Sequence, residues 1–535
     1  MNIHRLRVLQ VWLVLLFWFS IVFLTQIFIV FLNDLFDLIV GFSSHDFWTL
    51  FFQAYWGLSA ILVASACLYI SHRQLQGKHW RIPKVDLTRQ NEVALILLSI
   101  VLRLVLAPLF SHGGDMTTFL LAGYNIAHGN DPYDMALSAY EGPEIPVMIQ
   151  GRDRFALGYP LLWGLIASFS YRLSNLIDPN SLALYIFTLK SWLIMSEILL
   201  AYLLFYTIKQ SGDREKGVRA ALFFLLCPFV ILVGSVWGQN DVLCALFLIL
   251  SMNLLVRGRP FASGLTLGAG FAVKYYPIVT APILFLSLRD RKQKGTFILG
   301  VAVAVLIVLF YPFLVWGGNR GMRYLTMLSS LSQMSGGNQT LLTPFYAVET
   351  MFQVIRKDSW IQAWFWFKDN PLVRSFWMLP MIWLYLRHES LVGAKSSDSK
   401  PTLQEILPSS ISALLILMTF KLWVTEQLFL TPLTLSILYS YSAEAEDSDY
   451  LNLLWILLVL SCWFTTRLGQ VLLLPVWDLV KGWAFYITYL GNRYMFWIRS
   501  LTSSLVSLYI ATFNLTYIYV LQRRTDGSVN IEKKQ

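Results

Sequence analysis

Apolar stretches long enough to cross a bilayer recur along the whole chain and alternate with short polar segments. A helix needs about 20 apolar residues to cross roughly 30 Å of hydrocarbon. Stretches close to this length are residues 8–32, 47–71, 93–110, 182–208, 218–236, 241–256, 296–316, 371–387, 451–466 and 494–521. Two longer stretches, 261–288 and 406–441, are interrupted by polar residues, so each is expected to form two short helices. The pattern predicts an all-α integral-membrane protein, a multispanning helical bundle with about 14 spans.

Composition agrees with this fold class. Hydrophobic residues make up 56% of the 535 residues and charged residues 13%, which excludes an ordinary soluble protein. The net charge of +10 therefore concerns the two sides of a membrane rather than nucleic-acid binding. With the N-terminus inside, most Lys and Arg residues fall in loops of one side, as the positive-inside rule requires. The longest loop of the opposite side, residues 111–181, contains only three of them.

This outer loop carries the first candidate for chemistry. Asp115 follows the span at 93–110 directly, and the segment Met116–His128 is expected to form a short amphipathic helix that the turn at 129–133 ends. A carboxylate held between a membrane helix and an interfacial helix is more rigid than one at a loop tip. Asp115 is therefore the candidate catalytic base.

A second acidic residue lies in the tight outer turn between the spans at 218–236 and 241–256. The turn places Gln239 and Asp241 at the outer membrane surface, where they would face Asp115 and contact substrate, as an acceptor contact or through a metal ion. The alternative is a polar turn with an interfacial tryptophan, Trp237, which is common in membrane proteins.

The interrupted stretches place ionisable residues below the outer surface, where they are costly and by default candidates for function. Lys274 would neutralise a phosphate at headgroup depth, the neighbouring Tyr275 would contact substrate, and Glu426 would contact a sugar. An internal pair between Lys421 and Glu426 is the structural alternative. Arg103, near the middle of its span, would serve either the phosphate or a structural ion pair.

Several motifs together resemble the GT-C superfamily of integral-membrane glycosyltransferases, and most closely the mannosyltransferases related to the PIG-V and PIG-M enzymes. The resemblance covers residues 93–441. It rests on the Asp after a span, G-N-D-P-Y at 129–133, the Tyr-Pro at 159–160, V-W-G-Q-N-D at 236–241, A-S-G-L-T-L-G-A-G-F-A-V-K-Y-Y-P at 262–277 and K-L-W-V-T-E-Q-L-F-L-T-P at 421–432. The superfamily's catalytic base maps onto Asp115, and a second outer acid maps onto Asp241. Where relatives often have a His before the Glu, this chain has Thr425, which leaves the role of Glu426 open.

The resemblance implies an inverting transfer of a sugar, mannose above all, from a polyprenyl- or dolichyl-phosphate donor to a glycan or lipid-linked acceptor. Asp115 would accept the acceptor's proton while Lys274 or Arg103 stabilises the departing phosphate. The active site would face away from the cytoplasm, in the plasma membrane of a prokaryote or the endoplasmic reticulum of a eukaryote. A transporter or flippase for a lipid-linked sugar is the alternative class, since buried charges and broken helices also occur there.

The chain divides into three predicted parts. Residues 1–92 hold two additional spans and a basic inner loop, 93–441 form the catalytic core, and 442–535 contain further spans and a basic tail. The four cysteines all fall within apolar spans, so neither a disulfide framework nor a metal motif is present. The requirement for a divalent cation is therefore left open.

Overall fold

The structure, a computed structural model of the chain, describes nine segments of the sequence. They are residues 88–133, 157–210, 212–333, 375–393, 400–421, 425–442, 471–472, 507–508 and 510–523. Of residues 113, 114, 327–333, 426, 471 and 472 only the backbone is described. The predicted spans at 8–32, 47–71 and 451–466 lie outside these segments, so the count of 14 spans and the three-part division stay predictions.

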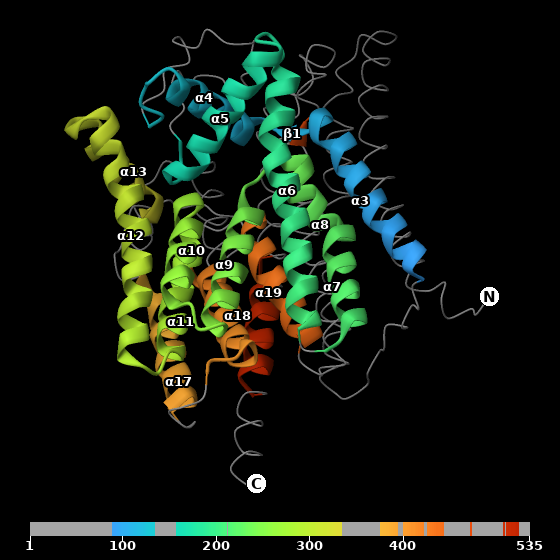
Figure 1. The fold of residues 1–535 in the computed structure, drawn as a ribbon. Coiled ribbons are helices and arrows are strands. Elements are labelled where there is room, and N and C mark those ends of the chain that lie inside the picture. Colours follow the sequence, from blue (N-terminus) through green and yellow to red (C-terminus); the bar gives the residue numbers. More distant parts are fainter. Residues whose placement is uncertain are drawn as a thin grey trace, which may run out of the picture.

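The described residues are almost entirely helical, as the hydrophobic pattern predicts (Figure 1). Four of these helices are long and apolar enough to cross a membrane. They are α3 (Arg89–Leu109), α6 (Leu182–Lys209), α12 (Arg291–Trp316) and α18 (Leu403–Phe420). The apolar residues of α3 are largely exposed, for example Leu97 and Val101, as expected for a helix that faces lipid. The membrane class is therefore supported by the length and composition of these helices.

The predicted span 218–236 is not one straight helix. It consists of α7 (Arg214–Leu226), α8 (Pro228–Ile231) and the π-helix η2 (Leu232–Trp237), with a bend of 49° at the break. Pro228 explains the break, because proline disfavours a helical conformation in the residue before it. Counted as one bent span, this pair brings the candidate spans of the described residues to five.

Both interrupted stretches break where the sequence predicts. The first forms α10 (Pro260–Val273), then extended backbone at Lys274, η3 (Tyr276–Thr280) and α11 (Ala281–Ser287). The second continues from α18 to η4 (Glu426–Phe429) and α19 (Leu430–Ser442). These breaks leave polar backbone and side chains inside the protein, and they come next to the short helix α9 (Asp241–Val256).

Two helices lie across one end of the bundle, above α9 and α10 (Figure 1). They are α4 (Gly113–Ala127) and α5 (Leu161–Ile177). The helix expected at 116–128 is confirmed, but its side chains are buried on almost every side, so it is not an amphipathic surface helix. The cause is its packing against α5 and α6, where the hydroxyl of Tyr185 donates to the carbonyl of Leu120 at 3.0 Å. The described part of the predicted outer loop thus forms a layer of packed helices, α4 and α5, at one end of the bundle.

The remaining described helices complete the bundle. They are α13 (Gly318–Gln333), which follows α12, and α17 (Met378–Gly393), which packs against α11 and α18. Residues 510–523 are also helical. The described residues contain one pair of two-residue strands, in which β1 (Ser111–His112) pairs antiparallel with β2 (Val471–Leu472).

A buried ion pair joins three elements in the middle of the bundle. Arg103 of α3 donates to Glu197 of α6, and both side chains are fully buried. The hydroxyl of Ser235 in η2 lies 3.4 Å from the same carboxylate. A Cβ at Gly234 would lie 1.7 Å from Glu197 Oε1, so only glycine leaves room for the carboxylate. This pair fixes the angle at which η2 meets α3 and α6.

We predict that Arg103→Met destabilises the protein more than the double variant Arg103→Met with Glu197→Gln does. The single change leaves a charged carboxylate buried without a counterion, which costs about 3–5 kcal/mol, whereas the double change leaves no charge. Melting temperatures of purified protein in detergent measure the difference. A double variant less stable than Arg103→Met would contradict this assignment of the pair.

Candidate active site

Asp115 lies in the first turn of α4, directly after the membrane helix α3 and the strand β1. The sequence prediction of its place is therefore confirmed. His112 precedes α4 as its N-cap, and its Nδ1 atom accepts a hydrogen bond from the backbone N–H of Asp115 at 3.1 Å. The Asp115 side chain is 30% exposed. It is thus held at a helix start and can still be reached by a substrate.

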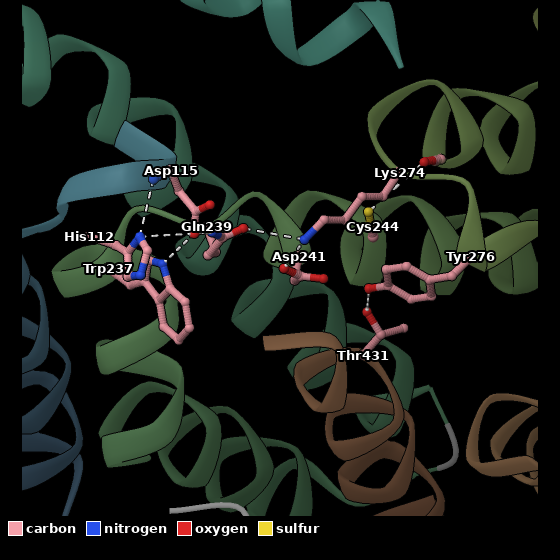
Figure 2. A network of polar contacts seen from close by, with 10 residues as sticks. His112, Asp115, Trp237, Gln239, Asp241, Cys244, Lys274, Tyr276 and Thr431 are labelled. Atoms are coloured by element: carbon pink, nitrogen blue, oxygen red, sulfur yellow. Dashed lines mark hydrogen bonds and ion pairs between the residues drawn. The ribbon is translucent and has the colours of Figure 1, made fainter. Parts of the chain in front are cut away.

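The contacts of the Asp115 carboxylate converge on one oxygen, Oδ2 (Figure 2). Nε1–H of Trp237 donates to it at 2.9 Å, and Nε2–H of Gln239 also donates to it. Nδ1 of His112 lies 3.2 Å away, but as an acceptor of the Asp115 amide proton it has no proton of its own to donate. The two donors therefore orient the carboxylate, and Oδ1 has no hydrogen bond from the described residues.

Packing of rings and backbone holds these donors. The rings of His112 and Trp237 stack with centroids 4.9 Å apart and an interplanar angle of 24°. Gly238, the next residue, has φ +90°. A Cβ there would lie 2.5 Å from Cε of Met116 and 3.0 Å from Cε of Lys190. The positive φ is the reason that glycine is required here, and any larger side chain would also have to displace the ends of Met116 and Lys190.

Lys190 of α6 binds the two chain segments that form the site. Its fully buried ammonium group donates to the carbonyl of Phe110 and to those of Ser235 and Val236, at 3.1 and 2.8 Å. Phe110 precedes β1 and α4, and the two other residues precede Trp237. Neither Lys190 nor Glu197 was predicted from the sequence as part of the site. An ionisable residue within the apolar stretch at 182–208 was the signal that would have found them.

Gln239 connects Asp115 to a buried ion pair (Figure 2). Its Oε1 accepts a hydrogen bond from Nζ of Lys274 at 3.3 Å, and the same Nζ lies 2.6 Å from Oδ2 of Asp241. Lys274 also lies over the ring of Tyr159, with Nζ 5.0 Å from the centroid. Asp241 is fully buried, and the side chain of Lys274 is 5% exposed. The structure thus brings together the predicted residues Asp115, Gln239, Asp241 and Lys274.

The phenol of Tyr159, which lies next to Lys274, is neutral. Burial raises its pKa well above the ordinary value of 10.0, and the charges of Asp115 and Asp241 raise it further, while a hydrogen bond with Gln239 lowers it. The phenol is therefore unsuited to act as a base at neutral pH.

A second polar group extends the site toward η4 and α19. The hydroxyl groups of Tyr276 and Thr431 are hydrogen bonded to each other. Nζ of Lys421 donates to the hydroxyl of Tyr275 at 2.7 Å and lies 4.2 Å from the centroid of its ring. The predicted substrate contact at Tyr275 is therefore next to a cation, and it stays a prediction. The side chain of Glu426 lies outside the described residues, so neither its sugar contact nor its pairing with Lys421 is tested.

The sequence left open whether Arg103 forms a structural ion pair. The structure shows such a pair, since the guanidinium of Arg103 binds Glu197 within the bundle. A role at the donor phosphate stays a prediction for Arg103 and also for Lys274, whose charge is matched by Asp241. Among the described residues no group of three or more His, Cys, Asp or Glu side chains could hold a metal ion. The cation requirement is still open.

One family model matches the chain, that of Glycosyltransferase family 87, over residues 176–391. The match supports a membrane glycosyltransferase of the GT-C type. It includes Gln239, Asp241 and Lys274, and it begins after Asp115. No curated protein matches the chain. The resemblance to the PIG-V and PIG-M enzymes is not confirmed.

We predict that Trp237→Phe lowers kcat about 10- to 100-fold, because a hydrogen bond to a charged group contributes about 1.5–3 kcal/mol. Phenylalanine keeps the stacking on His112 and removes only the Nε1–H donor. Trp192→Phe is the matched control, since Trp192 contacts the ring of Phe169 and not the site. Sugar-transfer turnover of the purified variants checks both. Equal turnover in Trp237→Phe and wild type would show that the Nε1–H group of Trp237 does not orient the Asp115 carboxylate.

Proposed function

We propose that the protein transfers a hexose, mannose in the first instance, from a polyprenyl-phosphate donor to a glycan or lipid-linked acceptor. The family match supports the glycosyltransferase class. The observation that carries the proposal further is the Asp115 carboxylate, which is oriented through Oδ2 by two donors and has Oδ1 without a bond from the described residues. A general base needs this combination of fixed orientation and a free oxygen.

The proposed reaction is a single displacement. The acceptor hydroxyl oxygen forms a bond to the anomeric carbon, while the bond from that carbon to the phosphate oxygen breaks. Oδ1 of Asp115 takes the hydroxyl proton, and the electron pair of the broken bond leaves with polyprenyl phosphate. Direct displacement inverts the anomeric centre. A retaining route would need a positioned nucleophile, and Asp241, the second carboxylate, is fully buried against Lys274.

A lipid-linked donor fits the place of Asp115. The residue lies in the first turn of α4, shortly after the end of the membrane helix α3, so a phosphate at headgroup depth would approach from the bilayer. The basic loops of the sequence favour a site on the non-cytoplasmic face, where nucleotide sugars are generally absent. The membrane would be the plasma membrane of a prokaryote or the endoplasmic reticulum of a eukaryote.

We predict that Asp115→Asn abolishes transfer and leaves folding and membrane insertion near normal. Asparagine keeps the shape of the side chain but cannot accept the proton as a carboxylate does. The test compares product formation from polyprenyl-phosphate mannose and a lipid-linked acceptor at equal amounts of monodisperse purified protein. Asp178→Asn, on an exposed residue at the end of α5, is the matched control. Turnover of Asp115→Asn within about twofold of wild type would reject the base.

A further inference from the structure

The side-chain amide of Gln239 has a defined orientation. Its Nε2–H group donates to Oδ2 of Asp115, and its Oε1 accepts from Nζ of Lys274 at 3.3 Å. The reverse orientation would place an oxygen against the carboxylate and an NH₂ group against the ammonium, so both contacts would become repulsive. Gln239 itself is fully buried. The amide therefore responds to charge at both of its ends.

The four residues that these contacts link, Asp115, Gln239, Lys274 and Asp241, differ in how exposed their side chains are. The Asp115 side chain is 30% exposed, whereas that of Lys274 is 5% exposed and Asp241 and Gln239 are fully buried. In this geometry a substrate can reach Asp115 without displacing Gln239 or the ion pair behind it. This arrangement favours support of the base over direct contact with the substrate.

We propose that Gln239 is a positioning residue, which couples the Lys274–Asp241 ion pair to Asp115 and thereby fixes the orientation of that carboxylate. The inference rests on the proposed function, because it assigns the residues that support its base. Lys274 polarises the amide through Oε1, which strengthens the Nε2–H donor on the far side. Asp241 holds Lys274 at the amide.

Other titratable groups among the described residues also face this chain of contacts. His112 lies against Oδ2 of Asp115, and Tyr159 lies against Lys274 as a neutral phenol. Cys244, Tyr275 and Tyr276 face Asp241. Lys190 passes next to Gly238, but its ammonium group binds backbone carbonyls. Gln239 is thus the described link between the Asp115 carboxylate and the Lys274 ammonium.

The decisive variant is Gln239→Glu, which changes one group and keeps the shape. It places a second carboxylate against Oδ2 of Asp115, and two adjacent carboxylates hold a proton up to higher pH than one does. The acidic limb of kcat against pH should therefore move upward by about one unit or more. A residue that only fills space would not move this limb. Gln239→Met, which removes the donor, should lower kcat at least about tenfold with the donor KM unchanged.

The ion pair provides an independent readout. Lys274→Met leaves Asp241 buried without a counterion and removes the polarising charge, so kcat should fall, with the donor KM again unchanged. The double variant Lys274→Met with Asp241→Asn should regain part of the lost turnover, because no unpaired charge remains to pull the amide away. If Lys274 instead binds the donor phosphate directly, its loss raises the donor KM and Asp241→Asn does not correct it. That result would overturn the inference.

Controls separate this inference from the proposed function. Gln210→Glu makes the same chemical change at the exposed end of α6, where Gln210 accepts from Arg257, and should leave the pH profile unchanged. Wild-type protein without transferase activity would reject the proposed function itself. Active wild type, an inactive Asp115→Asn, and a Gln239→Glu profile that superimposes on wild type would keep the function and reject the inference. If Gln239→Glu does not fold, the test rests on Gln239→Met. An unchanged kcat in that variant would reject the positioning role of Gln239.

Discussion

The site depends on one buried ammonium group. Lys190 of α6 holds the carbonyls of Phe110, Ser235 and Val236, which belong to segments more than a hundred residues apart in sequence. One segment leads into Asp115 and the other into Trp237 and Gln239. A lysine inside an apolar bundle is costly unless its hydrogen bonds are satisfied, and here three carbonyls left open by irregular backbone satisfy it. The same contacts thus stabilise the break in each segment and set the distance between the Asp115 carboxylate and its hydrogen-bond donors.

The charged groups become less buried from the middle of the bundle toward the end that α4 and α5 cross. The Arg103–Glu197 pair is fully buried, the Lys274–Asp241 pair is nearly so, and Asp115 is partly exposed. The first pair sets the packing of α3, α6 and η2, and the second lies against Gln239. In our proposal this order lets the protein hold a reactive carboxylate rigidly while leaving one of its oxygens open to an acceptor hydroxyl.

The positions of many helices and breaks can be predicted from local signals in the sequence. The side-chain contacts of the site cannot be predicted in this way. Hydrophobic length predicted α3, α6 and α12, and polar residues within long apolar stretches predicted the breaks at Lys274 and after Phe420. The bend at Pro228 and the burial of α4 depend on packing, which periodicity alone does not show. Asp115, Gln239, Asp241 and Lys274 were found as separate candidates by residue type. The sequence could not show that the Gln239 amide links Asp115 to Lys274, or that Lys190 binds three backbone carbonyls. These contacts became visible only in the structure, because the partners come from different helices.

We propose that Asp115 and its neighbours serve transfer from a lipid-linked sugar. The most direct measurement is mass spectrometry of the products formed by purified protein with a lipid-linked acceptor and one of two donors. Preformed polyprenyl-phosphate mannose should give a mannosylated acceptor by itself. Nucleotide-linked mannose should give product only after a polyprenyl-phosphate charging enzyme is added. Direct transfer from the nucleotide sugar, without that enzyme, would contradict the claim.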